Sequence, residues 1–269
     1  MIIRKFAFLA LCACLILTCA ITISCGGSSS PSKTGCTGGP FDVVGDWTLT
    51  GSGSSGSSSG PGVINSSGLA VFFQTSTSEP APGDTLVLPT ITGICSFSGT
   101  VTAYGTPASG GGAASNSVQG NVESATSITA KIANGNTLSL AASSPLSGPI
   151  TAFSGSGWIA EIEGWTGDNV WQLTFAPTGN NASMNFSGSS NLCDISGTFT
   201  QEQGGASDLN VFDVSITYSA GIGCPPSGNG IGFESSSDYF NLNGNAQGTY
   251  LYAASSSSAS VLEVFKQTQ

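Results

Sequence analysis

The chain contains no histidine, and Arg4 is its only arginine. Without histidine there is no Ser-His-Asp or Cys-His nucleophile system and no imidazole ligand for a metal ion. Without a second arginine, no guanidinium fork is present downstream to hold a phosphate group. These absences exclude much hydrolytic, metal-centred and phosphate-binding chemistry.

Positive charge is scarce in general, with five Lys and Arg residues against fifteen Asp and Glu residues. A chain this acidic cannot neutralise the phosphates of a nucleic acid, so DNA and RNA are excluded as partners. Charged residues make up only 7% of the chain, but the hydrophobic content of 39% predicts a packed core.

Helical periodicity is also missing after the N-terminal apolar run, whereas period-two alternation recurs. The segment "ITAKIANGNTLSLAA" predicts a hairpin with a tight turn at Asn134-Gly135. Its apolar face would carry Ile128, Ala130, Ile132, Leu138 and Leu140. The segment "NVFDVSITY" predicts a strand with one apolar face, made of Phe212, Val214, Ile216 and Tyr218. About fifteen such runs predict an all-β fold of antiparallel barrels or sandwiches.

Two Gly/Ser-rich tracts interrupt this pattern. Residues 26–35, "GGSSSPSKTG", predict a flexible tether, and residues 51–62, "GSGSSGSSSGPG", predict a mobile loop.

An internal repeat relates "CSFSGTVT" at 95–102 to "CDISGTFT" at 193–200. Alternation places four residues of each copy on an inward face: Cys95, Phe97, Gly99 and Val101, then Cys193, Ile195, Gly197 and Phe199. We interpret the copies as equivalent strands of two related antiparallel modules, 41–155 and 156–269. A chance match of Gly/Ser/Thr-rich sequence is the alternative.

The eight cysteines separate by position. Three lie inside the N-terminal apolar run, Cys25 lies at its end, and four follow: Cys36, Cys95, Cys193 and Cys224. Four cysteines in an exported chain predict two disulfides. A hairpin of 193–201 with 211–219 would bring Cys193 near Cys224, which leaves Cys36 to pair with Cys95. Four free thiols are the alternative, and no metal site is predicted.

The N-terminus begins with "MIIRK" and continues with 19 uncharged residues, a pattern typical of an export signal. An uncleaved anchor is the alternative, and both place residues 26–269 outside the cytoplasm. The motif "TISC", ending at Cys25, resembles the lipobox of bacterial lipoproteins, although Thr22 stands where that family usually has leucine. The resemblance implies a signal peptide over 1–24, a lipid (palmitate) on Cys25 and a tether over 25–40. Gly26 in place of aspartate resembles the outer-membrane sorting pattern.

The second module resembles a loose group of uncharacterised exported bacterial proteins. The resemblance lies in "CDISGTFT", "NVFDVSITY", "CPPSGNGIGF" and the closing "GTYLYAA" and "VLEVF". It implies an exported β-rich module and no particular activity.

Two carboxylates could form a glycosidase pair, which needs no histidine. Glu161 and Glu163 share one face of a predicted strand between Trp158 and Trp165. The alternative, which we favour, is a solvated strand face.

Oxygen ligands for calcium occur at two places. One place has Asp168 and Asn169, and the other has Asp208, Asn210 and Asp213. Their spacing favours turn formation by these side chains instead. Four aromatic residues near the C-terminus could bind a glycan or a partner protein: Tyr239, Phe240, Tyr250 and Tyr252. Packing in the barrel wall or in the core is the favoured alternative.

Together these patterns predict a lipid-anchored protein of the bacterial cell envelope, located at the outer membrane and acting as a non-enzymatic binding or structural module. The expected partners are the membrane and a glycan or envelope protein, with no cofactor and no metal. The alternative is a carbohydrate-active enzyme using Glu161 and Glu163. A ligand inside a barrel is a third hypothesis.

Overall fold

The structure is a computed structural model of the whole chain. It describes residues 40–53, 56–73, 85–105, 112–143, 149–163, 170–179, 182–204, 207–219, 224–236, 249–255 and 261–266. All described residues belong to one compact unit, residues 38–269. Within these described ranges, no helix is long and apolar enough to cross a membrane.

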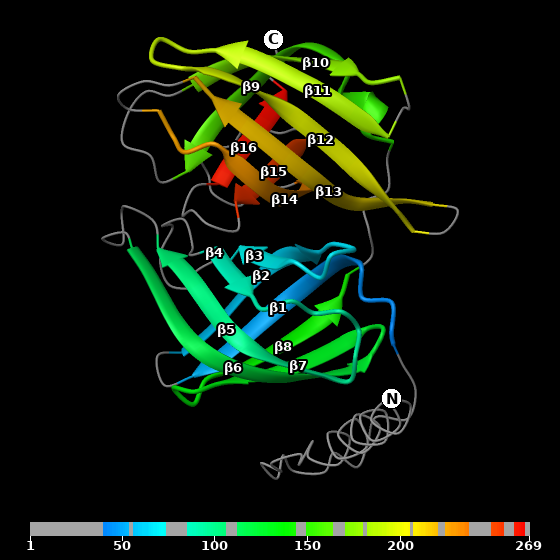
Figure 1. Cartoon of the computed structure of the whole chain (residues 1–269), viewed down its shortest axis with the longest axis vertical. Coiled ribbons are helices and arrows are strands. Elements are labelled where there is room, and N and C mark those ends of the chain that lie inside the picture. The colour runs from blue at the N-terminus through cyan, green and yellow to red at the C-terminus, as the bar shows by residue number, and fades with distance from the viewer. Residues whose placement is uncertain are drawn as a thin grey trace, which may run out of the picture. The chain divides into compact units, whose positions relative to one another are not determined.

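The first half of the described chain forms a closed antiparallel barrel (Figure 1). Each strand pairs with the next along the chain, and β1 pairs with β8 to close the barrel. The strands are β1 (Gly45–Gly53), β2 (Gly56–Ile64), β3 (Ala70–Phe73), β4 (Thr85–Leu88), β5 (Ser96–Gly105), β6 (Gly112–Ser124), β7 (Ser127–Ile132) and β8 (Thr137–Ala142).

The second half forms another closed antiparallel barrel, preceded by a short 3-10 helix, η2 (Ile150–Phe153). Strand β9 closes it by pairing with both β10 and β16. The strands are β9 (Gly155–Glu163), β10 (Val170–Pro177), β11 (Ser183–Ser189), β12 (Asp194–Gly204), β13 (Ser207–Tyr218), β14 (Gly228–Ser235), β15 (Tyr250–Ser255) and β16 (Val261–Lys266). The all-β, antiparallel prediction is confirmed, and both modules are barrels.

The predicted hairpin at Asn134-Gly135 is present between β7 and β8. Gly135 has a φ of +94°, which suits the tight turn because glycine has no Cβ to clash there. The apolar face predicted for this hairpin is buried inside the first barrel: Ile128, Ala130, Ile132, Leu138 and Leu140.

The loop predicted at residues 51–62 is wrong, because residues 51–53 and 56–62 lie in the paired strands β1 and β2. Small residues suit this position for a steric reason. A Cβ on Gly62 would collide with the ring of Phe72 on β3 and with the carbonyl of Val71. Pairing of β1 with β2 and close packing of β2 on β3 therefore form strands from a sequence that does not itself signal them.

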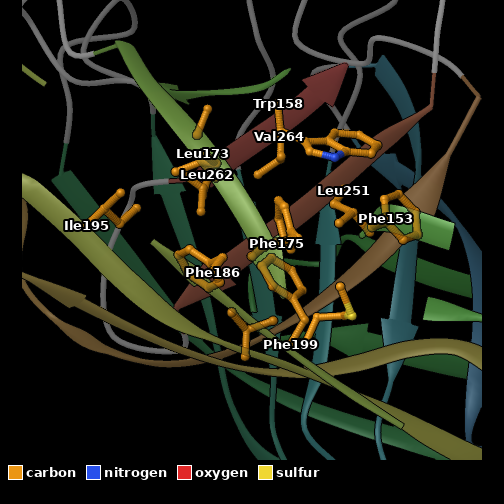
Figure 2. Packing of buried hydrophobic residues seen from close by; sticks show 14 of the residues in the cluster. Phe153, Trp158, Leu173, Phe175, Phe186, Ile195, Phe199, Leu251, Leu262 and Val264 are labelled. Atoms are coloured by element: carbon orange, nitrogen blue, oxygen red, sulfur yellow. The ribbon is translucent and has the colours of Figure 1, made fainter. Parts of the chain in front are cut away.

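Both barrels have filled interiors among the described residues. In the second barrel, Phe175, Phe186 and Phe199 come from three consecutive strands and point toward one another (Figure 2). Their ring centroids lie 5.3 to 6.1 Å apart, in the range of favourable aromatic packing. Trp47 and Leu49 are central to the corresponding cluster of the first barrel.

The repeated segments lie in β5 and β12. Their apolar side chains face the interiors as expected, with Val101 in one core and Ile195 and Phe199 in the other. The strands are not equivalent, however, because β5 is the fifth strand of its barrel and β12 the fourth along the chain. The repeated sequence therefore has the same inward-facing pattern in both barrels but lies in strands of different order.

A third apolar cluster contains outward-facing residues of both barrels. Val63, Val71 and Phe73 contribute from β2 and β3, and Phe233 and Tyr252 contribute from β14 and β15. The ring centroids of Phe73 and Phe233 lie 5.3 Å apart. Tyr250 also belongs to this cluster, so both tyrosines pack away from the barrel interior and are buried. Neither offers an exposed platform for a glycan, while Tyr239 and Phe240 lie outside the described residues.

Candidate functional site

A groove of about 760 Å³ crosses the outer face of the second barrel over β9 to β13. Two rows of exposed polar side chains line it, each running from strand to strand. The first row consists of Ser156, Thr174, Ser187, Ser196 and Thr217, which are successive cross-strand partners. The second row consists of Gln172, Ser189, Asp194 and Ser219.

Strand register produces these rows. Side chains alternate across a strand, so inward Trp171, Leu173 and Phe175 leave Gln172 and Thr174 on the outer face. A register shift in the β9–β10 pair falls between Leu173 and Thr174. Five strands spaced by about 4.8 Å make the first row roughly 19 Å long.

The polar side chains of the lining are mostly neutral hydroxyls and amides, which both donate and accept hydrogen bonds. Apolar residues also line the groove: Trp158, Ile159, Leu173 and Ile195. Among the described lining residues, Asp194 is the one ionisable side chain. Its backbone N–H donates to the hydroxyl of Ser219 at 2.9 Å, and the Ser219 N–H donates back to its carbonyl at 2.9 Å. The second row is therefore held in place where it crosses from β12 to the end of β13.

A disulfide lies next to this end of the groove, between Cys193 and Cys224, the pairing that the predicted hairpin favoured. Their Cα atoms are 5.8 Å apart. The indole N–H of Trp171 donates to the Cys193 carbonyl at 2.8 Å, as does the Ser190 hydroxyl at 3.0 Å. Sequence reasoning paired the cysteines but gave no sign of these two hydrogen bonds.

The three other predicted cysteine sites are Cys25, Cys36 and Cys95. Cys95 is disulfide-bonded, and its partner lies outside the described residues. Cys36 and Cys25 also lie outside them, so the pairing of Cys36 with Cys95 and the lipidation of Cys25 stay predictions.

Of the proposed glycosidase pair, Glu161 is not among the described residues that line the groove. Glu161 is half-buried on the outer face of β9, directly opposite the fully buried Glu263 of β16. The side chain of Glu163 lies outside the part of the chain that the structure describes. Trp158, expected to flank the pair, instead faces the interior and packs on Phe153 with ring centroids 5.2 Å apart (Figure 2).

Asp46 of β1, a largely buried carboxyl group, was not among the predicted site residues. Asn210 of β13 donates its side-chain N–H to Asp46 Oδ1 at 3.0 Å and to the carbonyl of Glu234 at 2.9 Å. Burial raises the pKa of Asp46 to about 7. The hydrogen bond from Asn210 acts to lower this pKa, and the negative charge of Glu234 acts to raise it. Burial also raises the pKa of Glu234.

A second polar contact joins β12 to the turn after β2. The backbone N–H of Ser66 donates to both carboxyl oxygens of Glu202, at 2.9 and 3.0 Å, and the Ser66 hydroxyl donates at 2.8 Å. Asn65 donates to Asp213 at 2.9 Å. Burial is the main cause of a raised pKa at Glu202. The hydrogen bonds from Ser66 oppose this shift, and Asp213 adds to it.

These contacts give Asn210 and Asp213 structural partners, although both were considered as calcium ligands. Of the other candidates, Asp168 and Asn169 lie outside the described residues, as does the side chain of Asp208. Within the described part of the chain, no group of three or more His, Cys, Asp or Glu residues is placed to hold a metal ion.

No known protein family matches the chain, and no curated protein is similar to it. A solved structure with a distant likeness is a protein of Bacteroides fragilis NCTC 9343 described as a "putative outer membrane protein". The alignment covers 84% of this chain and 98% of that chain, with 14% sequence identity and a TM-score of 0.23. A likeness this distant assigns neither an activity nor a location.

Proposed function

We propose that the chain is a lipid-anchored protein of the bacterial cell envelope that binds a neutral glycan chain in the groove of the second barrel, without catalysing a reaction. The observation that carries the binding proposal is the pair of cross-strand rows of hydroxyl and amide side chains, centred on Ser187 and Ser196. Sugar hydroxyls are both donors and acceptors, as are these side chains.

Charge favours a neutral ligand. The chain has a formal net charge of −10, and Asp194 is the one ionisable side chain among the described lining residues of the groove. An anionic polymer would be repelled by this field, while a neutral polymer would not.

The filled barrels favour an outer site over an interior one. A small cavity beside Val214 and Leu262 holds about 20 Å³, room for about one water molecule. The described part of the second interior is otherwise occupied by its aromatic cluster.

The anchor proposal rests on the lipobox-like motif ending at Cys25. Several acyl chains hold a protein stably on a membrane, whereas one chain binds only marginally. Labelling with radioactive palmitate should mark the wild-type protein and not Cys25→Ala. Equal labelling of both would contradict the anchor.

Affinity electrophoresis in gels containing dextran, starch, mannan or a β-glucan tests the groove. We expect at least one of these neutral polysaccharides to retard the wild type. Ser196→Trp, which fills the groove, should weaken binding at least tenfold. Ser139→Trp is the matched control, because Ser139 is an exposed serine on the outer face of β8 in the first barrel.

Two results would overturn the binding proposal. One is the absence of retardation by every neutral polysaccharide, and the other is an equal loss of binding in both tryptophan variants. Release of reducing ends from a bound polysaccharide would contradict the non-enzymatic assignment. Glu161→Gln would then test whether Glu161 is responsible.

A further inference from the structure

The contact between the two barrels has an apolar centre and a polar rim. Phe73 of the first barrel lies at the centre, with ring centroids 5.3 Å from Phe233 and 6.2 Å from Tyr252. The rim consists of the hydrogen bonds that join Asp46 to Asn210, Asn65 to Asp213 and Ser66 to Glu202. We call these rim residues, with Glu234, the junction.

The junction contains four carboxyl groups as two interacting pairs, Asp46 with Glu234 and Glu202 with Asp213. Asp46 comes from β1, Glu202 from β12, Asp213 from β13 and Glu234 from β14. Strand β2, which also pairs with β1 there, places the apolar Val63 opposite Asp46. Within the described part of the chain, the partners of these carboxyl groups are amides, hydroxyls, backbone groups and one another, and none is a lysine or arginine.

The geometry around Asp46 favours its protonated form. Oδ1 accepts the hydrogen bond from Asn210, while Oδ2 is buried and has no hydrogen-bond partner among the described residues. A buried carboxylate oxygen without a donor is costly, and adding a proton to it removes the charge. The carboxyl group of Glu234 adds negative charge nearby, which also favours the protonated form of Asp46.

We propose that the junction is a pH-operated latch: with Asp46 protonated it holds the two barrels together, and loss of that proton loosens the contact while each barrel stays folded. Each barrel has its own closed ring of strands and its own core, so the junction can open without breaking either.

The direction follows from the proton balance. In the closed junction Asp46 has a pKa of about 7, raised from an ordinary value of 3.8. Below about pH 4 both states hold the proton, so closure does not depend on pH. Between about pH 4 and pH 7 the open state loses its proton first, and the closed-to-open ratio falls by at most about a thousandfold.

Hydrogen–deuterium exchange of the full lipidated chain in detergent micelles tests the latch between pH 5 and pH 9, with rates corrected for the intrinsic effect of pH. The amide of Ser66 reports opening because it bonds across the junction to Glu202. The β7–β8 hairpin reports the integrity of the first barrel. We expect the protection of the Ser66 amide to fall at least tenfold between pH 5 and pH 8, with the hairpin unchanged.

Asp46→Asn should remove this pH dependence, because the amide keeps the acceptor for Asn210 and carries no charge. Glu234→Gln is a second variant that should reduce the loss. Glu123→Gln is the matched control, since Glu123 is exposed on the first barrel and bonds Thr129 within it. Three results would each overturn the proposal. They are a Ser66 protection that does not change with pH in the wild type, an equal loss of protection in the β7–β8 hairpin, and the same loss at Ser66 in Asp46→Asn as in the wild type.

Discussion

The hydroxyl of Tyr252 donates a hydrogen bond of 3.0 Å to Glu263 Oε1, and neither residue has exposed surface. They are cross-strand partners on β15 and β16, on the outer face of the second barrel. Tyr252 also stacks on Phe233, with ring centroids 5.4 Å apart. The contact between the barrels therefore buries a carboxyl group as well as aromatic rings, so its stability depends on polar satisfaction as much as on apolar area.

Tyr252→Phe should lower the free energy of unfolding by about 1 to 3 kcal/mol, because it removes a donor from a buried carboxyl group while keeping the ring. Urea titration followed by circular dichroism measures the change. Tyr104→Phe, at a partly exposed tyrosine of β5, is the control and should cost less. Equal unfolding midpoints for Tyr252→Phe and wild type would contradict the structural role of this bond.

Gly93→Ala should destabilise the first barrel more than Gly135→Ala. Both glycines have positive φ, +74° and +94°, so both substitutions carry backbone strain of about 1 to 2 kcal/mol. A Cβ on Gly93 would in addition collide with the carbonyl of Phe41, whereas a Cβ on Gly135 meets nothing within 4 Å. Thermal unfolding of the two variants measures the difference, and equal losses would contradict the close approach of Phe41.

Replacing Cys193 and Cys224 together by serine should lower the free energy of unfolding by roughly 3 to 4 kcal/mol, from the chain-entropy estimate for a separation of 31 residues. Urea titration without reductant measures the loss. Dithiothreitol should lower the wild-type midpoint more than that of the double variant. A double variant as stable as wild type would show that the bridge adds little.

Local patterns predicted the parts of the fold that depend on neighbouring residues. Alternation and the Asn134-Gly135 turn were sufficient for the β7–β8 hairpin, since both act over a few residues. Barrel closure was not predictable in this way, because the pairing of β1 with β8 depends on shear and strand tilt across the whole sheet. The loop predicted at 51–62 was wrong for another reason: its small residues show no period-two alternation, although residues 51–53 and 56–62 lie in the paired strands β1 and β2.

The sequence pointed to carboxylates at Glu161 and Glu163 because they are neighbours along the chain. The structure gathers Asp46, Glu202 and Glu234 from three separate strands, so no spacing rule could have found them. The groove was missed for a related reason. Its rows run across strands, and serine and threonine on alternating positions are also typical of any solvated β face.

Asp46→Asn should stabilise the protein at pH 8 and leave its stability unchanged near pH 4. Folding raises the pKa of this carboxyl from 3.8 to about 7, so the folded state binds the proton more tightly than the unfolded state. Wild-type stability therefore falls as pH rises from about 4 to 7, by roughly 4 kcal/mol at most, and the asparagine variant avoids this loss. Urea titrations at the two pH values measure the effect, with Glu123→Gln as the control. Equal midpoints for wild type and Asp46→Asn at pH 8 would mean that the carboxyl group is hydrated in the folded protein and that its burial between the barrels is incomplete.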